Sequence, residues 1–174
     1  AAWVEMAVGS RLLVDGIDWV GQTVRLHRAA GEATFTVDAA DVYSVETVNG
    51  RWCWLDGIEP VLSDHQPFMT VRWPARFGVN AAGGPIRLAG QVYSHGVGVH
   101  SASRVIFPVK GAARFHCVAG LDASAGPLAN VDIQVLLDGK PALEQKGISF
   151  ASKPIAIDLP LNGAQKLELR VGFG

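Results

Sequence analysis

The chain has almost no imbalance of charge, because 15 Lys and Arg residues face 16 Asp and Glu residues and leave a formal net charge of −1. Proteins that bind nucleic acid or anionic membranes ordinarily carry a strongly basic face. No apolar run approaches the about 18–20 residues that a membrane-spanning helix needs. We therefore expect neither nucleic-acid binding nor membrane insertion, and a partner that is uncharged. The first ten residues also lack the order of a signal peptide, so we expect a fragment or a mature segment of a longer protein.

Cysteine is scarce as well. The two cysteines, Cys53 and Cys117, lie far apart in the sequence among large apolar residues. Two cysteines are too few for a disulfide framework, so we expect two buried thiols. A bridge between them, which would need a suitable spacing of the two Cα atoms, is the less favoured alternative.

Helical periodicity is hard to find, because 20 glycines and 9 prolines interrupt most windows of the sequence. Short runs of alternating apolar and polar residues, such as 131–135, are common, and turn dipeptides such as Asp138-Gly139 and Asn162-Gly163 separate them. Repeated hairpins need two sheets to bury their apolar faces. The pattern therefore predicts an all-β protein with a β-sandwich.

The composition and the periodicity of the sequence change near residue 60. Five short strands expected between Trp3 and Leu55 suffice for a small β-barrel-like or small-sheet module over residues 1–60. Residues 61–174 form the larger predicted domain, and its first part, 61–84, is rich in Pro, Gly and Ala and is typical of an irregular connecting segment. A single larger β-domain is the alternative.

Residues with the chemistry of an active site gather near position 100 without forming a recognisable motif. His95 and His100 are the obvious metal pair, but residues five apart on an extended strand point to opposite faces, and no cysteine or acid stands close by to complete a zinc set. A hydrolytic triad could be composed of Ser101 or Ser103 together with His100 and Asp122. However, the G-x-S-x-G motif is missing. We therefore predict no metal and no nucleophilic catalysis here.

A pair of catalytic carboxylates is the remaining enzymatic possibility, with Asp122 and either Asp132 or Glu144 as its members. Asp132 falls on the outward face of its predicted strand. Nothing in the pattern singles out acids in a catalytic environment, so we predict that the chain is not an enzyme.

Aromatic residues are more suggestive of binding. Trp52 and Trp54 are two residues apart and would share a face of any strand, where a core or domain-interface position is the ordinary interpretation. Trp73, Phe77 and Tyr93 lie in or beside the irregular segment, and Trp73 is the tryptophan we expect to be exposed. A flat exposed ring offers a surface for the C–H face of a neutral sugar, and nearby polar side chains supply hydrogen bonds.

From about residue 83 to 171 the order of landmarks resembles a known family, the NPCBM domain, which is assigned to carbohydrate-binding module family 51. The matching pieces are "GGPIRLAGQVYSHGVGVHSAS", "FHCVAGLD", "VDIQVLLDGKPAL" and "KPIAIDLPLNGAQKLELRV". They supply, in order, Gly96, Gly98, His100, Ser103, Gly120, Asp122 and the Asp138-Gly139-Lys140 turn. The first 58 residues lie outside the resemblance.

The resemblance implies a galactose-binding-like β-sandwich of the jelly-roll type, often attached to secreted or periplasmic proteins that act on glycosides. Gly96, Gly98 and His100 match a fold signature, in which glycines permit close strand approach and the histidine satisfies buried polar groups. Some relatives hold a structural calcium ion. The loop after Gly120 carries few acids, so we expect no cofactor here and keep calcium as an open alternative.

Together these observations predict a non-catalytic carbohydrate-binding module for a neutral, galactoside-like glycan, inside a larger secreted, periplasmic or cell-surface protein. Its expected partners are a carbohydrate and other domains of the same polypeptide. The ligand-binding residues we expect are Trp73, Tyr93, His95, His100 and Asp122. A structural or protein-interaction β-sandwich without sugar binding is the alternative.

Overall fold

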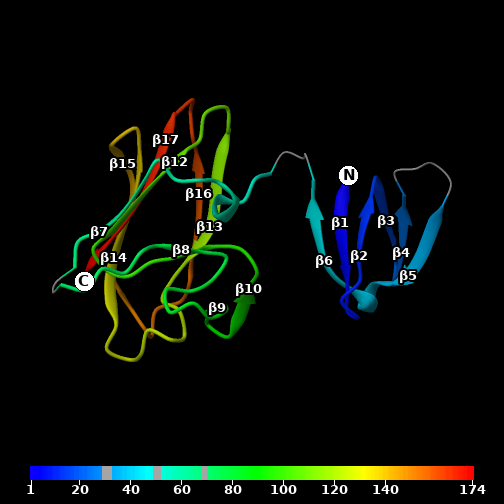
Figure 1. Ribbon diagram of the computed structural model, residues 1–174, viewed down its shortest axis with the longest axis horizontal. Helices are drawn as coiled ribbons and strands as arrows, with labels where there is room; N and C mark the ends of the chain where they lie inside the picture. The colour runs from blue at the N-terminus through cyan, green and yellow to red at the C-terminus, as the bar shows by residue number, and fades with distance from the viewer. Residues whose placement is uncertain (29–32, 49–51, 68–69) are drawn as a thin grey trace. The chain divides into compact units, whose positions relative to one another are not determined.

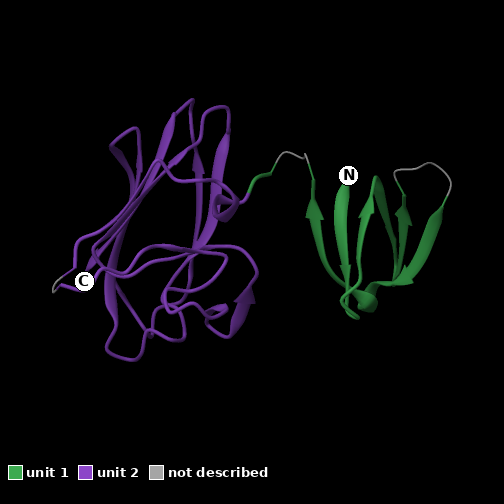
Figure 2. Cartoon of the chain, viewed as in Figure 1, with its two compact units in different colours: residues 1–53 green, residues 54–174 purple. Residues whose placement is uncertain are grey.

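The computed structural model describes residues 1–28, 33–48, 52–67 and 70–174. It divides the chain into two compact units, unit 1 (Ala1–Cys53) and unit 2 (Trp54–Gly174) (Figure 1, Figure 2). The sequence predicted the boundary near Pro60, and the two compact units divide between Cys53 and Trp54. The physical reason is that Leu55 and Ile58 pack against the core of unit 2.

Unit 1 consists of two three-stranded antiparallel sheets, with strand orders β2-β1-β6 and β3-β4-β5. Its elements are β1 (Ala2–Met6), β2 (Arg11–Val14), β3 (Gly16–Val20), β4 (Thr23–His27), β5 (Thr34–Asp38), the 3₁₀ helix η1 (Ala39–Asp41) and β6 (Val42–Thr47). The described part therefore holds six strands, where the sequence predicted five. Asp15 separates β2 from β3 and donates its backbone N–H to the carbonyl of His27 at 2.7 Å.

The core of unit 1 is small. Ala2, Val4, Val14, Val24 and Leu26 are its buried apolar residues. They come from β1 and β2 in one sheet and from β4 in the other, so the core brings together residues of both sheets.

Unit 2 is built around a five-stranded antiparallel sheet with the order β15-β14-β17-β12-β7. Beside it lies the pair β13-β16, and the short pairs β8-β11 and β9-β10 complete the unit (Figure 1). The elements are η2 (Leu55–Gly57), β7 (Leu62–His65), β8 (Arg76–Phe77), β9 (Ile86–Leu88), β10 (Gln91–Tyr93), β11 (Val97–Gly98), β12 (Ser103–Pro108), β13 (Arg114–Ala119), β14 (Asn130–Leu137), β15 (Lys140–Ser149), β16 (Ile155–Pro160) and β17 (Lys166–Phe173).

The core of unit 2 follows the alternation of the strands. Phe107 of β12, Leu167 of β17 and Val135 of β14 are fully buried on the inner face of the five-stranded sheet. Phe115 of β13 and Ile157 of β16 belong to the same buried cluster. Two sheets thus bury their apolar faces against each other, as in sandwiches generally. The predicted all-β sandwich is confirmed.

The segment 61–84 is less irregular than the sequence predicted, because β7 and β8 lie within it. β7 pairs with β12 and forms an edge of the five-stranded sheet, with His65 opposite Ser103. Without β7, the backbone groups along that side of β12 would lack partners, which is costly. In the described ranges, no helix has the length and apolar character needed to cross a membrane.

The two cysteines differ in environment, and both are free. Cys53 is exposed, so the prediction of a buried thiol is wrong for this residue, while burial raises the pKa of the partly buried Cys117 thiol to about 12. Because the thiolate is the reactive form, we expect one fast thiol per chain when an aromatic disulfide reagent is added at about pH 8. Cys53→Ser should abolish the fast phase, and Cys117 should react only in denaturant. A fast phase that persists in Cys53→Ser would contradict the structure.

Candidate functional site

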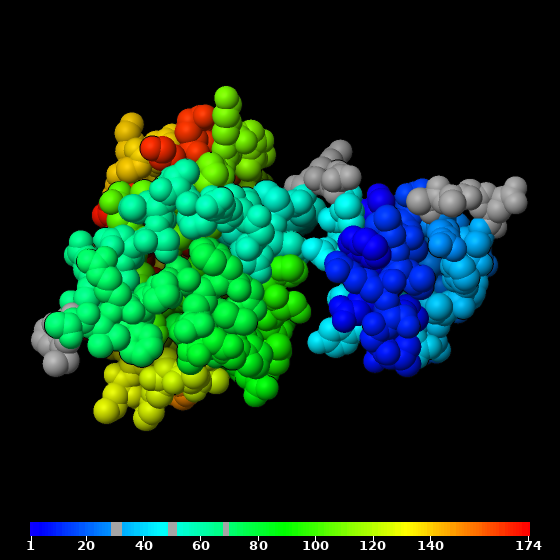
Figure 3. All heavy atoms as spheres, in the orientation of Figure 1, coloured from blue at the N-terminus to red at the C-terminus, as the bar shows by residue number. Residues whose placement is uncertain are grey.

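The segment from β7 to β11 carries most of the predicted binding residues and forms much of the face of unit 2 seen in Figure 3. It is held in place by a turn around the buried residue Asn80. The Oδ1 of Asn80 accepts hydrogen bonds from the N–H groups of Ala82 and Gly84 at 3.0 and 2.8 Å. Its Nδ2 donates to the carbonyl of Pro85 at 3.1 Å and to Asp122 at 2.9 Å. A fully bonded buried amide of this kind fixes the turn.

Asp122 serves this turn rather than an open surface. Besides Asn80, its carboxylate accepts the backbone N–H of Arg87 at 2.7 Å and both the N–H and the hydroxyl of Ser124 at 2.9 and 2.6 Å. Burial alone would raise the pKa of Asp122, but the hydrogen bonds from Ser124, Arg87 and Asn80 together hold it below its ordinary value. A role for Asp122 in ligand binding stays a prediction.

Two other predicted residues, Trp73 and His100, are brought together by the structure. Their ring centroids lie 4.8 Å apart at an interplanar angle of 41°, and the Trp73 side chain is about half exposed. The backbone N–H of Trp73 donates to Nδ1 of His65 at 3.1 Å, and the His65 ring lies 6.4 Å from that of His100. An accepting Nδ1 places the proton of a neutral His65 on its Nε2.

His100 only partly fulfils its predicted role of satisfying buried polar groups. A hydrogen bond with the backbone of Ala81 acts on its ring. However, Nε2 of His100 and the hydroxyl of Ser103 are both buried without a hydrogen-bond partner among the described residues. Burial is the main cause that lowers the pKa of His100 from 6.5, followed by the charges of His65 and Arg76. The ring is therefore neutral at pH 7.

The lowered pKa of His100 makes the stability of unit 2 depend on pH. In the unfolded chain the ring takes up a proton near pH 6.5, whereas the folded chain resists protonation, so the free energy of unfolding falls as the pH drops below about 6.5. We expect a lower melting temperature at about pH 5.5 than at about pH 7.5, and a smaller difference in His100→Gln. His116→Gln, an exposed histidine in β13, is the control. An unchanged pH difference in His100→Gln would contradict this assignment.

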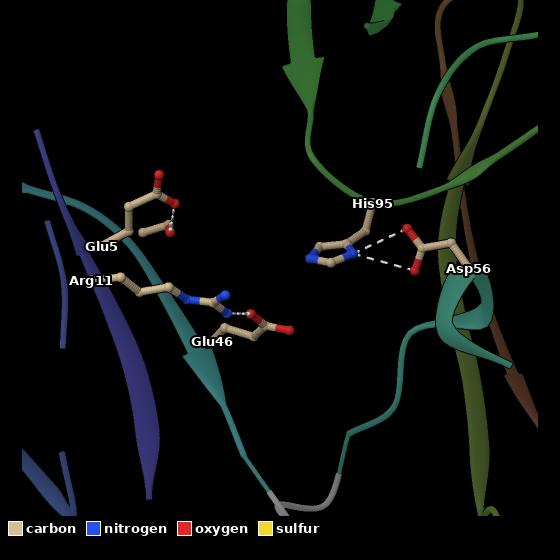
Figure 4. Close-up of polar contacts among 6 residues, drawn as sticks. Glu5, Arg11, Glu46, Asp56 and His95 are labelled. Atoms are coloured by element: carbon tan, nitrogen blue, oxygen red, sulfur yellow. Dashed lines mark hydrogen bonds and ion pairs between the residues drawn. The ribbon is translucent and has the colours of Figure 1, made fainter. Parts of the chain in front are cut away.

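His95 lies in a different cluster, which we call the Trp54 platform and which consists of Trp54, Asp56 and His95. The Trp54 and His95 rings are parallel, with centroids 4.4 Å apart and an interplanar angle of 1°. Nδ1 of His95 lies 3.2 and 3.1 Å from the two carboxylate oxygens of Asp56 (Figure 4). Asp56 also accepts the N–H of Gly96 at 3.1 Å, and its side chain is only 8% exposed. An anchored carboxylate thus orients the imidazole, and the imidazole supports the indole.

The five predicted binding residues take part in separate contacts, and their role in binding stays a prediction. Trp73 contacts His100, and His95 belongs to the Trp54 platform. Tyr93, in β10, is partly buried and donates its hydroxyl to Gln91 at 3.3 Å. No group of three or more His, Cys, Asp or Glu residues in the described part of the chain is placed to hold a metal ion.

Three residues of these clusters, His65, Trp54 and Asp56, were not expected from the sequence. Trp52 and Trp54 are 65% and 47% exposed and lie outside the strands, so neither is a core residue. The Asp56-Gly57 dipeptide, a turn signal directly after Leu55, indicates that no strand runs through Trp54. No local signal marks His65, whose strand β7 is placed opposite Ser103 of β12 by the fold.

Three solved structures have the same fold. The CBM51-2 and INT domains of Clostridium perfringens ZmpB, in complex with GlcNAc, give a TM-score of 0.65 at 15% identity, covering 93% of this chain and 36% of that one. The CBM51 of C. perfringens GH95, in complex with methyl-galactose, gives 0.61 at 21% identity, covering 70% and 87%. The tandem CBM51 modules of the Streptococcus pneumoniae family 98 glycoside hydrolase give 0.58 at 21% identity, covering 83% and 52%.

The chain thus spans little more than a third of the length of the ZmpB structure. No curated protein matches it. The family model described as the NPCBM/NEW2 domain matches residues 53–174, which is more than half of the chain and includes the β-sandwich. The chain therefore belongs to the NPCBM/NEW2 domain family.

Proposed function

We propose that unit 2 is a non-catalytic carbohydrate-binding module that recognises a neutral, galactoside-like glycan as part of a larger extracytoplasmic protein. Membership of the NPCBM/NEW2 family supports the class of ligand. Two structures of the same fold support it further, since one CBM51 is in complex with methyl-galactose and another with GlcNAc. The neighbours are domains of larger proteins, which is consistent with a modular role.

The observation that carries the proposal is the geometry of the Trp54 platform. The indole of Trp54 is 47% exposed, and one of its faces is stacked on His95. The other face is a flat apolar surface of the kind that the C–H face of a sugar covers. Nε2 of His95 has no hydrogen bond to the described residues, so it can bond a sugar hydroxyl beside the ring. Because the platform is already ordered, binding costs little side-chain entropy.

The surroundings of the acidic residues support a non-catalytic role. Asp122 is engaged in the turn around Asn80. Asp132 accepts the N–H of Gly147 at 2.7 Å, and Glu144 bonds Gln134 at 3.0 Å and pairs with Lys146 at 3.4 Å. Each acid that could have formed a catalytic pair thus has a structural partner of its own.

Screening of the labelled 174-residue chain on an array of neutral glycans tests this function. We expect binding to galactoside-terminated glycans, and calorimetry should then give a saturable isotherm with the matching methyl galactoside. The absence of binding at millimolar ligand would overturn the proposal. It would favour a structural or protein-interaction role for the sandwich.

A further inference from the structure

The outer face of the five-stranded sheet holds a cleft of about 370 Å³. Val105, Phe107 and Leu167 point into the core, so their neighbours on β12 and β17 point outward. The cleft is lined by Arg104, Ile106, Asp138, Gly139, Lys166 and Glu168. None of these residues belongs to the Trp54 platform. The volume is at the lower end of the about 300–1,000 Å³ that ligand sites occupy, which suits one or two sugar units.

Glu168 at the base of the cleft has its carboxylate occupied. Its side chain is 5% exposed, and its oxygens accept Nε and Nη2 of Arg104 at 2.5 and 3.2 Å. It also pairs with Arg170. The hydrogen bond from Arg104 is the main cause that lowers the pKa of Glu168, so the group is ionised at neutral pH.

Asp138 on the rim is occupied too. Its carboxylate accepts the backbone N–H of Gln165 at 3.1 Å and that of Lys166 at 2.9 Å, which ties the β14–β15 turn to the start of β17. Both carboxylates that line the cleft therefore have hydrogen-bond partners in the protein.

The groups left without a partner are cationic donors. The ammonium group of Lys166 makes no ion pair and no hydrogen bond with the described residues, and neither does Nη1 of Arg104. The residues that line the cleft carry two positive charges, on Arg104 and Lys166, and two negative charges, on Asp138 and Glu168. Arg170 does not line the cleft but pairs with Glu168, and it adds a third positive charge beside it. Asp64 lies opposite Arg104 in the register of β7 and β12, but Arg72 offsets it at 3.8 Å. With Arg170 counted, the cleft and its immediate surroundings carry one net positive charge, in a chain whose net charge is −1.

We infer that this cleft binds an anionic group, a carboxylate or a sulfate, carried by a saccharide. The anionic group of the ligand lies between Lys166 and Arg104 and accepts hydrogen bonds from both. Hydrogen bonds to a charged acceptor are stronger than those to a neutral one. Ile106 supplies an apolar surface for the sugar ring. The inference rests on the proposed function in naming a saccharide. It assigns the molecule a second site, which is selective for acidic sugars.

The test is calorimetry on the full chain with three oligosaccharides of equal length: neutral galactan, oligogalacturonate and sulfated galactan. Lys166→Gln is the variant and Lys153→Gln, an exposed lysine before β16, is the matched control. We expect at least one acidic ligand to bind the wild type more tightly than galactan and to lose about tenfold in affinity in Lys166→Gln, as expected for a lost charged hydrogen bond. Lys153→Gln should bind as the wild type does, and added salt should weaken the interaction.

The outcomes separate the two proposals. If Lys166→Gln loses affinity for oligogalacturonate alone, the ligand of the cleft is a uronic acid. If it loses affinity for sulfated galactan alone, the ligand is a sulfated sugar. Galactan binding that survives in Lys166→Gln, without any preference for the acidic ligands, would overturn the second site and leave the proposed function standing. Binding of an acidic ligand that depends on Lys166, without binding of galactan, would overturn the proposed function and leave the second site standing. Equal affinities of Lys166→Gln and the wild type for all acidic ligands would also overturn the inference.

Discussion

Gly98→Ala should destabilise unit 2 by about 3 kcal/mol or more, at the upper end of the range for overpacking. A Cβ at this position would lie 2.4 Å from the carbonyl carbon of Asn80, 2.5 Å from the nitrogen of Ala81 and 2.6 Å from the carbonyl oxygen of Val79. These three atoms belong to the backbone, so no side chain can turn aside to make room. The strand would have to move away from the turn around Asn80. Urea unfolding followed by tryptophan fluorescence measures the effect.

Gly172→Ala is the matched control, because the added Cβ would meet only ordinary contacts at 3.8 and 4.0 Å from Asp132. We expect it to change the free energy of unfolding by less than about 1 kcal/mol. Equal losses of unfolding free energy in the two variants, or near wild-type stability of Gly98→Ala, would contradict this prediction. Either result would show that the close approach of Gly98 to the backbone of the Asn80 turn does not constrain the fold.

Trp54→Ala should weaken glycan binding by about 30-fold or more, since a buried aromatic anchor at a binding surface commonly contributes about 2 kcal/mol. The change removes the stacking surface and also the ring that lies against His95. Calorimetry with the galactoside selected on the array measures the affinity. The melting temperature should be recorded for each variant, so that a loss of binding is separated from a loss of folding.

Trp52→Ala provides the comparison, because Trp52 is also exposed and stands two residues earlier in the chain. It should bind the glycan as the wild type does. His95→Gln should give an intermediate loss of glycan affinity. The indole of Trp54 stays, but it no longer has the imidazole stacked against it or the neighbouring hydrogen-bond group. If Trp54→Ala bound normally, the Trp54 platform would not be the binding site.

The strands and turns of unit 2 could be predicted because their signals are local. Val131 and Val135 alternate with polar neighbours and are buried as expected. The Asp138-Gly139 turn has positive φ at both residues, 47° and 80°, which is the conformation that such a dipeptide favours in a tight hairpin. The predicted family is also confirmed, and the match begins at residue 53 rather than near 83.

The clusters could not be predicted because they depend on long-range contacts. Asp56 and His95 are 39 positions apart in sequence and meet only when the chain has folded. The same holds for Trp73 and His100, whose rings belong to separate segments of the chain and lie 4.8 Å apart only in the folded protein. His95, Trp73 and His100 could be identified as residues of interest from the sequence. Their division between two clusters follows only from the fold.

Binding at the Trp54 platform can be observed by NMR, through the tryptophan indole N–H signals, as the galactoside is added to the 174-residue chain. We expect a saturable shift of the Trp54 signal, assigned through Trp54→Ala. The signal of Trp19, which is exposed in unit 1, should not shift. A titration in which no tryptophan signal of unit 2 moves at millimolar ligand, or in which Trp54 stays unchanged while the glycan binds, would contradict this expectation.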